Sequence, residues 1–424
     1  MRRRVLLALA VLVAFVLGAW AWASVDRCGE WEPQAPGLVG LGRAKGPLRV
    51  GAAVVPLEPP WPVTVAGYGP PRASVSRSDA DVTARATVVE VGGQSIALVL
   101  VDTLLVTSSM RAALQQDVGL PLWLAATHTH SSLGGYDARL ASEVAALGRY
   151  RPEVEAAVLD AAKAAVTKAR ARLAPARLEV VTEDAGGLAR ARSGDAVDSA
   201  LTRVRFVGEA GPIAQWLVLT GHPTLVARRP DALHPDWPGT LATKVEQSGG
   251  PVTLVLQGAG GNATVSSSLG ESPLVFAAVV QGHVDALDAG VGVEEPELAW
   301  ADVALGLSRP DGSRLVPSAL RAAAENALCD GLERDVVVSA LRLGDLGFVL
   351  VPGEPSAAAG QVLVEQARAS RVVSLANGYV GYVELEAAAR TGDGESRRQY
   401  FGPGFLAQLA DAARLAGEAV RPAK

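Results

Sequence analysis

The chain has 424 residues, of which 49% are hydrophobic and 20% are charged, and its formal net charge is −5. This composition is that of a globular protein with a large core and does not indicate disorder. The acidic balance argues against nucleic acid as a partner, because proteins that bind a phosphate backbone carry an excess of Lys and Arg.

The N-terminus has the pattern of an export signal. Met1-Arg2-Arg3-Arg4 precedes an apolar stretch, residues 5–23, which ends in Ala21-Trp22-Ala23, an Ala-x-Ala cleavage site. Left uncut, a stretch of about 20 residues can span a bilayer, with the arginines on the cytoplasmic side. Residues 1–23 are therefore predicted to be a signal peptide or a membrane anchor. The protein is predicted to be exported, and periplasmic, secreted or anchored.

Residues 24–47 are rich in Pro, Gly and Arg and are predicted to be a linker. Cys28 lies in this segment, and the second cysteine is Cys329. In an exported protein the two could form a disulfide that ties the segment to the body, and two free thiols are the alternative. No later linker stands out, so residues 48–424 are predicted to form one large catalytic domain.

The rest of the chain mixes apolar runs of strand length with segments of helical periodicity, without strict alternation between them. This order favours stacked mixed β-sheets flanked by helices, an α/β fold of the mixed α+β type, over a doubly wound sheet. The expected strands are 48–54, 83–91, 95–103, 122–126, 177–182, 202–207, 213–220, 252–256, 336–343, 347–351 and 372–375. The expected helices are 153–173, 241–247, 274–287, 357–369 and 405–415.

Two histidines follow the apolar strand 122–126. His128 and His130 are two residues apart, and strand alternation places such residues on the same face. Gly134-Gly135 then allows a sharp turn. Two imidazoles that lie at a strand end beside a glycine-rich loop indicate a metal site. The alternative is a strand end with two histidines that are only hydrogen-bonded, since it has the same sequence pattern. The candidate imidazole ligands are limited to five residues: His128, His130, His222, His234 and His283.

Other polar residues also follow directly after apolar strands, which is where active sites are assembled at a sheet edge. Taken singly, each of these segments also reads as an ordinary turn. Their joint occurrence favours a common site. The segments are Gly221-His222-Pro223-Thr224, residues 257–264, Pro352-Gly353-Glu354-Pro355 and residues 376–382.

These motifs resemble the catalytic N-terminal domain of the neutral/alkaline non-lysosomal ceramidase family, over about residues 50–415. The most specific block is Thr127-His128-Thr129-His130-Ser131 with Gly134-Gly135-Tyr136. The family's C-terminal immunoglobulin-like domain is expected to have no counterpart. The other matching blocks are Val65-Ala66-Gly67-Tyr68-Gly69, Ala191-Arg192-Ser193, Gly221-His222-Pro223-Thr224, His234-Pro235-Asp236, Val351-Pro352-Gly353-Glu354-Pro355, Asn377-Gly378-Tyr379-Val380-Gly381-Tyr382 and Tyr400-Phe401-Gly402-Pro403.

The resemblance implies a zinc amidase. Zinc would polarise the scissile carbonyl and lower the pKa of a bound water toward about 7. His130 would hydrogen-bond the developing oxyanion, and Arg192 would orient the polar head of the substrate. Carried over position by position, the implied ligands are His128, His222, Glu354 and Tyr379, with Tyr382 as the alternative tyrosine.

One stretch departs from the family. The family's Gly-Asp-Val-Ser-Pro-Asn, whose serine is proposed as the nucleophile, aligns with Gly261-Asn262-Ala263-Thr264-Val265-Ser266. Thr264 keeps a hydroxyl but adds a methyl that restricts its approach, and Asn262 removes the neighbouring carboxylate. Thr264 is the candidate nucleophile because it keeps the hydroxyl. The two changes leave attack by a zinc-activated water open as the alternative.

Two functions follow from these residues. The first is an exported zinc hydrolase that cleaves the amide bond of an N-acyl, sphingolipid-like substrate and releases a fatty acid. The second is a non-catalytic or altered-specificity relative that binds a ligand at the membrane. A lipid-like small molecule is the expected partner, a membrane surface is a further candidate, and the oligomeric state is left open.

Overall fold

The computed structural model describes residues 31–70, 72–193, 196–266, 268–269 and 272–422. Before position 31 it also describes residues 11, 13, 14, 17, 18, 21, 25, 26, 28 and 29. The predicted signal segment, residues 1–23, thus lies largely outside the described residues. Among the helices of the described part, none combines the length and hydrophobicity needed to cross a bilayer.

Three mixed sheets form the body. One sheet has the order β7(Leu122–Ala126)-β6(Gln94–Val101)-β5(Thr83–Val91)-β2(Leu48–Pro56)-β8(Ala174–Pro175). A second has the order β13(Val252–Gln257)-β12(Gly211–Leu219)-β11(Ala200–Gly208)-β9(Arg177–Asp184). The third has the order β1(Gln34–Lys45)-β15(Glu297–Gly306)-β16(Asp335–Leu343)-β17(Leu346–Leu350)-β19(Arg371–Val373). Each sheet has one parallel pair, β6 with β7, β12 with β13 and β17 with β19, and the other pairs are antiparallel.

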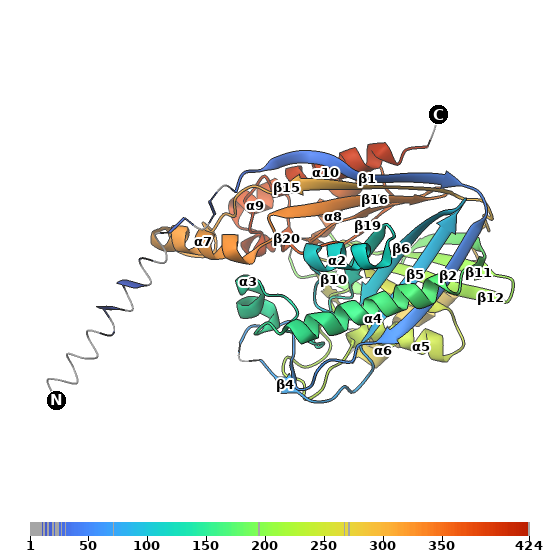
Figure 1. Ribbon diagram of the computed structural model, residues 1–424, viewed down its shortest axis with the longest axis horizontal. Helices are drawn as coiled ribbons and strands as arrows, with labels where there is room; N and C mark the ends of the chain where they lie inside the picture. Colours follow the sequence, from blue (N-terminus) through green and yellow to red (C-terminus); the bar gives the residue numbers. More distant parts are fainter. Residues whose placement is uncertain are drawn as a thin grey trace.

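Helices cover the outer faces of these sheets. α4 (Pro152–Arg170) lies across β2 and β5, while α8 (Ala357–Ala367) and α10 (Phe405–Ala419) lie on the β15–β16 side (Figure 1). α5 (Asp236–Gln247) and α6 (Pro273–Ala286) pack together and on the sheet that contains β13. The shorter helices include α2 (Ser108–Val118), α3 (Leu140–Ser142), α7 (Arg321–Gly331) and α9 (Glu386–Thr391).

Strand alternation explains this layering. In β6, Val99 and Val101 pack toward the cluster that contains α4, while Leu98 and Leu100 face a central core shared by all three sheets. Because both faces are buried, such strands read as continuous apolar runs. The central core also includes Trp216 of the second sheet and residues of the third. The predicted fold class, stacked mixed sheets flanked by helices, is confirmed.

Among the elements of ten or more residues, four were not predicted from the sequence. They are β1, α2, β15 and α7. The expectation of a linker is wrong over residues 34–45, because β1 forms an antiparallel ladder with β15 from Gln34 to Lys45. The backbone hydrogen bonds of this ladder stabilise a segment whose composition alone suggested a loop.

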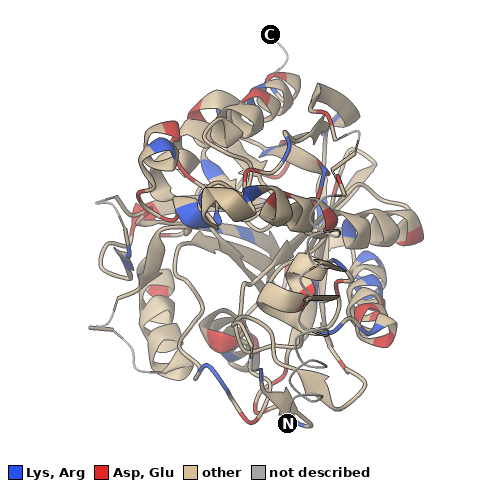
Figure 2. Ribbon diagram, turned by 90° about the vertical axis from the view of Figure 1, so that its left-hand side faces the viewer, with Lys and Arg blue, Asp and Glu red and all other residues tan. Residues whose placement is uncertain are grey.

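Acidic and basic residues are interspersed along the ribbon in the view of Figure 2.

A disulfide joins Cys28 to Cys329, across 301 residues of sequence. Of the two alternatives left open above, the structure has the disulfide. Cys28 is buried beside Trp31, whose indole donates to the carbonyl of Leu307. The disulfide therefore fixes the segment that precedes β1 against α7.

We expect Cys28→Ser/Cys329→Ser to lower the free energy of unfolding by about 3 kcal/mol, because the crosslink restricts a very long loop of the unfolded chain. Urea denaturation of the native and variant proteins measures the difference. A reducing agent should destabilise the native protein by a similar amount and leave the double variant unchanged. Equal midpoints for the native and variant proteins without reductant would contradict the assignment.

Candidate metal centre

The site lies where one edge of each of the three sheets meets the others. The loop after β19 crosses to β7, because the amide of Asn377 donates to the carbonyl of Leu124 at 2.7 Å and the amide of Ala126 donates to Leu375 at 3.1 Å. From the second sheet, the side chain of Gln257 donates to the carbonyl of Thr127 at 3.2 Å. The predicted convergence of strand ends is thus present, and backbone hydrogen bonds hold it together.

Several non-glycine residues of these loops have left-handed backbone conformations. They include His128 (φ 69°), Leu375 (φ 56°) and Asn377 (φ 66°). Such conformations cost free energy in residues with a side chain and persist where the surrounding structure imposes them, which is frequent at functional sites. The turn at His128 also changes the strand alternation assumed from the sequence. Even so, both imidazoles of the pair reach the same place.

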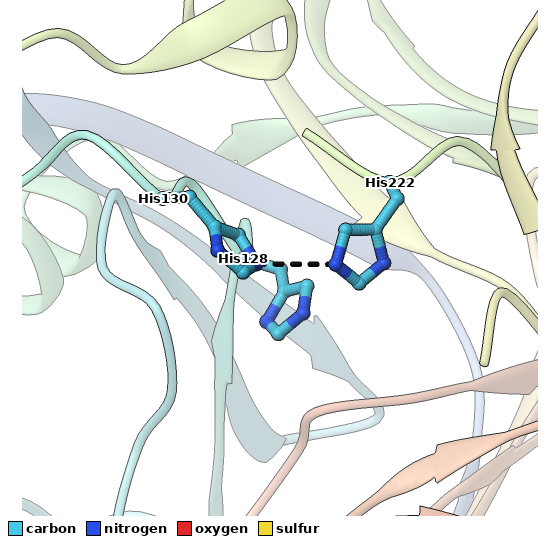
Figure 3. Close-up of side chains that lie close together, drawn as sticks. All are labelled: His128, His130 and His222. Atoms are coloured by element: carbon cyan, nitrogen blue, oxygen red, sulfur yellow. Dashed lines mark hydrogen bonds between the residues drawn. The ribbon is translucent and has the colours of Figure 1, made fainter. Parts of the chain in front are cut away.

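Three histidines gather at this edge (Figure 3). Metal-binding atoms of His128, His130 and His222 all lie within 4.8 Å of one another. The Nε2 atoms of His130 and His222 are 3.1 Å apart, and the ring of His128 lies 4.6 Å from that of His222. This group can hold a metal ion, since neutral imidazoles are common metal ligands.

A carboxylate and a phenol complete the cluster. Glu354, in β18 (Glu354–Pro355), places Oε2 3.2 Å from His128 Nε2 and 3.9 Å from His222 Nδ1. The hydroxyl of Tyr379 donates to Oε1 of Glu354 at 2.6 Å. The five residues His128, His130, His222, Glu354 and Tyr379, called the His–Glu–Tyr cluster below, therefore meet although they come from distant parts of the sequence.

The contacts of His128 fit a cation in the cluster. Its Nδ1 lies 2.7 Å from the carbonyl of Leu104, which requires a proton on Nδ1. In a neutral ring, Nε2 then carries only a lone pair. Among the described residues this buried atom has no hydrogen-bond partner, and it faces the Glu354 carboxylate. Two electron-rich atoms 3.2 Å apart need a proton or a metal ion between them. A histidine that donates its second nitrogen to a backbone carbonyl is also the usual arrangement of a metal ligand.

Burial and neighbouring charges set the protonation states. Burial and the neighbouring His128 lower the pKa of His130 to about 3, and they also lower the pKa of His222 well below its usual value. Burial alone would raise the pKa of Glu354, but the neighbouring imidazoles and the hydrogen bond from Tyr379 lower it to about 2. At neutral pH, His130 and His222 are therefore neutral and Glu354 is ionised, which are the forms that bind a metal.

Arg192 lies at the rim of the cluster. Its Nη2 donates to the carbonyl of Gly261 at 2.5 Å and to the hydroxyl of Tyr382 at 3.4 Å. Tyr382, the alternative ligand, thus faces Arg192, whereas Tyr379 faces Glu354. Thr264 lies in β14 (Ala263–Val265), opposite Arg190 of β10 (Ala189–Ala191), and is partly exposed. Among the described residues, its hydroxyl forms no hydrogen bond to a side chain of the cluster.

Asn262 has a structural role. Its Nδ2 donates to the carbonyls of Ser193 and Ala196, both at 2.9 Å, and its Oδ1 accepts the amide of Ala357 at the start of α8. An aspartate could not donate to the two carbonyls. The change from the family's Asp to Asn262 is therefore matched by hydrogen bonds that require the amide.

Sequence reasoning missed Glu333, which fixes the loop of Tyr379. The Glu333 side chain is 8% exposed. Its Oε2 accepts the amide of Tyr379 at 3.1 Å and the hydroxyl of Ser108 at 2.8 Å, and Arg139 lies 3.2 Å from its Oε1. In the sequence Gly-Leu-Glu-Arg-Asp, residues 331–335, it looks like a solvated turn residue. Only the fold brings it beneath the tyrosine.

We expect Glu333→Gln to reduce kcat on the order of 10- to 100-fold, because an amide cannot accept all these hydrogen bonds and the Tyr379 hydroxyl moves relative to Glu354. The visible spectrum of the cobalt-substituted protein should change with it. Glu155→Gln is the control. Glu155 and Glu333 line one cavity of about 400 Å³, but Glu155 accepts a hydrogen bond from the hydroxyl of Tyr150 instead. A lower melting temperature with an unchanged spectrum and kcat would show a merely structural role.

The comparisons with known proteins agree with this description. Residues 58–206 match the family model "Neutral/alkaline non-lysosomal ceramidase, N-terminal". The structure "Ceramidase complexed with C2" is similar, with a TM-score of 0.74 at 17% identity, over 89% of this chain and 77% of that one. Neutral ceramidase from Pseudomonas aeruginosa gives a TM-score of 0.73 at 18% identity, over 89% and 75%. No curated protein sequence matches the chain.

The family match begins just after β2, ends within β11 and includes the His128–His130 block. The structural likeness covers 89% of this chain and so extends well beyond the family match. Residues 58–206 are therefore similar to the neutral/alkaline non-lysosomal ceramidases, and the fold of the chain is that of the solved neutral ceramidases.

Proposed function

We propose that this protein is an exported, zinc-dependent hydrolase that cleaves the amide bond of an N-acyl, sphingolipid-like substrate. The observation that carries the proposal is the His–Glu–Tyr cluster, in which three imidazoles meet an ionised carboxylate and a phenol. Two imidazoles with oxygen ligands suit zinc, a borderline Lewis acid. When bound, zinc would supply polarisation of the scissile carbonyl and activation of a water.

The contacts support His128, His222, Glu354 and Tyr379 as the ligands. Glu354 lies within reach of both histidines and of the Tyr379 hydroxyl, whereas Tyr382 contacts Arg192. His130 is the third imidazole of the group and could replace one of the oxygen ligands. We assign to His130 the hydrogen bond to the developing oxyanion. Its low pKa keeps the ring neutral, and its Nε2 lies next to His222 within the cluster.

The substrate's polar head is assigned to Arg192, which lies at the rim and is held by Gly261 and Tyr382. Export is supported by the arginine-rich, apolar N-terminus and by the Cys28–Cys329 disulfide, since disulfides persist in oxidising compartments. A lipid-like substrate is consistent with the structural similarity to a ceramidase complexed with C2.

The test is metal analysis of purified protein followed by an assay on a fluorogenic N-acyl amine. We expect close to one zinc per chain, release of the fatty acid, and loss of both after dialysis against a chelator. Readdition of zinc should restore activity. A protein that contains zinc but does not cleave N-acyl substrates would instead support the alternative, a ligand-binding relative without turnover.

A further inference from the structure

A cavity of about 270 Å³ beside the cluster is lined by three arginines. Arg72, Arg228 and Arg229 line it together with Tyr68, and its other lining residues are Val65, Ala66, Gly69, Pro70 and Ala73. No aspartate or glutamate is among its lining residues. We call it the Tyr68 pocket. Its wall thus carries three positive charges and a phenol, a set that attracts an anion.

Within the described residues, these arginines differ from the others near the cluster in having no carboxylate partner. Arg192 lies 3.6 Å from Glu395, and Arg398 lies 3.1 Å from the same residue. Arg72, by contrast, donates to the carbonyl of Val144, and in the described part of the chain its buried Nε has no hydrogen-bond partner. Unpaired guanidinium groups around a cavity are placed to receive a charge from outside the chain.

The Tyr68 pocket adjoins the His–Glu–Tyr cluster directly. The ring of Tyr68 lies 5.1 Å from that of His130, and the guanidinium of Arg228 stacks on the Tyr68 ring at 4.7 Å. Gly67, at φ 106°, allows this approach, because a Cβ there would lie 2.7 Å from the Cα of His130. The ring of Tyr68 therefore separates a ligand bound at His130 from the arginines of the pocket.

We infer that the preferred substrate is an N-acyl amine whose amine half carries an anionic group, a phosphate or a carboxylate, which binds in the Tyr68 pocket. The inference rests on the proposed function and narrows its substrate class. The amide would lie at the cluster, and a short arm from its nitrogen would carry the anion past Tyr68 to Arg228 and Arg229.

The test compares two soluble substrates that differ only in the phosphate: N-octanoyl-phosphoethanolamine and N-octanoylethanolamine. Their kcat/KM is measured on zinc-loaded protein, and their Kd by calorimetry on metal-free protein, where no turnover occurs. We expect both measurements to favour the phosphate compound by about tenfold, and the preference to shrink at about 0.5 M NaCl, since salt screens exposed charges.

The variant Arg228→Gln/Arg229→Gln should bring the ratio of the two Kd values to about one. The control is Lys168→Gln/Arg170→Gln, which removes the same charge from the exposed last turn of α4 and should keep the native ratio. Both pairs are exposed, so neither change disturbs the core.

The outcomes separate this inference from the proposed function. Equal Kd values in the native protein would overturn the inference even if both amides are cleaved. A tenfold Kd preference that depends on Arg228 and Arg229 would uphold the pocket even if neither amide is cleaved, in which case the hydrolase proposal fails. If the double variant instead loses only its binding to phosphatidylglycerol vesicles, with equal Kd values for the amides, the arginines contact a membrane and the inference is wrong.

Discussion

His128→Ala and His222→Ala are each expected to retain less than about a tenth of the zinc of the native protein and to lose at least about a thousandfold in kcat/KM. Each change removes one of the two imidazoles that face the Glu354 carboxylate, and the three groups left of the assigned ligand set, one imidazole, the carboxylate and the phenol, bind zinc weakly. Without the metal, the remaining groups lack the means to polarise an amide carbonyl. Zinc content by mass spectrometry and initial rates on an N-acyl substrate measure both effects.

His283→Ala is the matched control for this experiment. His283 lies in the last turn of α6, outside the group of three histidines. It should leave zinc content and rate near native values. Stoichiometric zinc in both His128→Ala and His222→Ala would disprove the ligand assignment.

The second large effect concerns Thr264. We expect Thr264→Ala to keep its zinc and to lose on the order of 10- to 1000-fold in rate, the range for a lost positioning hydrogen bond. Thr264→Ser should be at least as active as the native protein, because it keeps the hydroxyl and removes the crowding methyl. Both expectations follow if a zinc-activated water attacks the amide.

The structure supplies a reason for this expectation. A hydroxyl nucleophile needs a neighbouring base. Asn262, which replaces the family's aspartate, uses its side chain to hold the carbonyls of Ser193 and Ala196 and the start of α8. An inactive Thr264→Ala that still holds its zinc, or an acyl group trapped on Thr264, would show instead that Thr264 is the nucleophile.

The strands that carry the site could be predicted because their signals are local. Strands 83–91 and 122–126 were expected with the bounds that the structure has, since each is a run of strand length that ends at a clear break, Gly92-Gly93 for the first and the polar residues after Ala126 for the second. The blocks around His128, His222, Glu354 and Tyr379 could be identified because each follows such a strand.

What could not be predicted depends on tertiary contacts. β1 is an exposed edge strand whose pairing with β15 leaves no mark in its Gly- and Arg-containing sequence. Glu333 acts on Tyr379 only after α7 has been placed by its packing and its disulfide. The arginines of the Tyr68 pocket come from two loops more than 150 residues apart, and no periodicity connects them.

The central claim is that His128, His222, Glu354 and Tyr379 share one zinc ion. Crystals of the zinc-loaded protein, measured on both sides of the zinc absorption edge, test it most directly. We predict a single anomalous peak with ligand atoms of these four residues at about 2.0–2.2 Å. A peak held by His128, His130 and His222 with the Glu354 carboxylate turned away, or no peak within the cluster, would contradict the account.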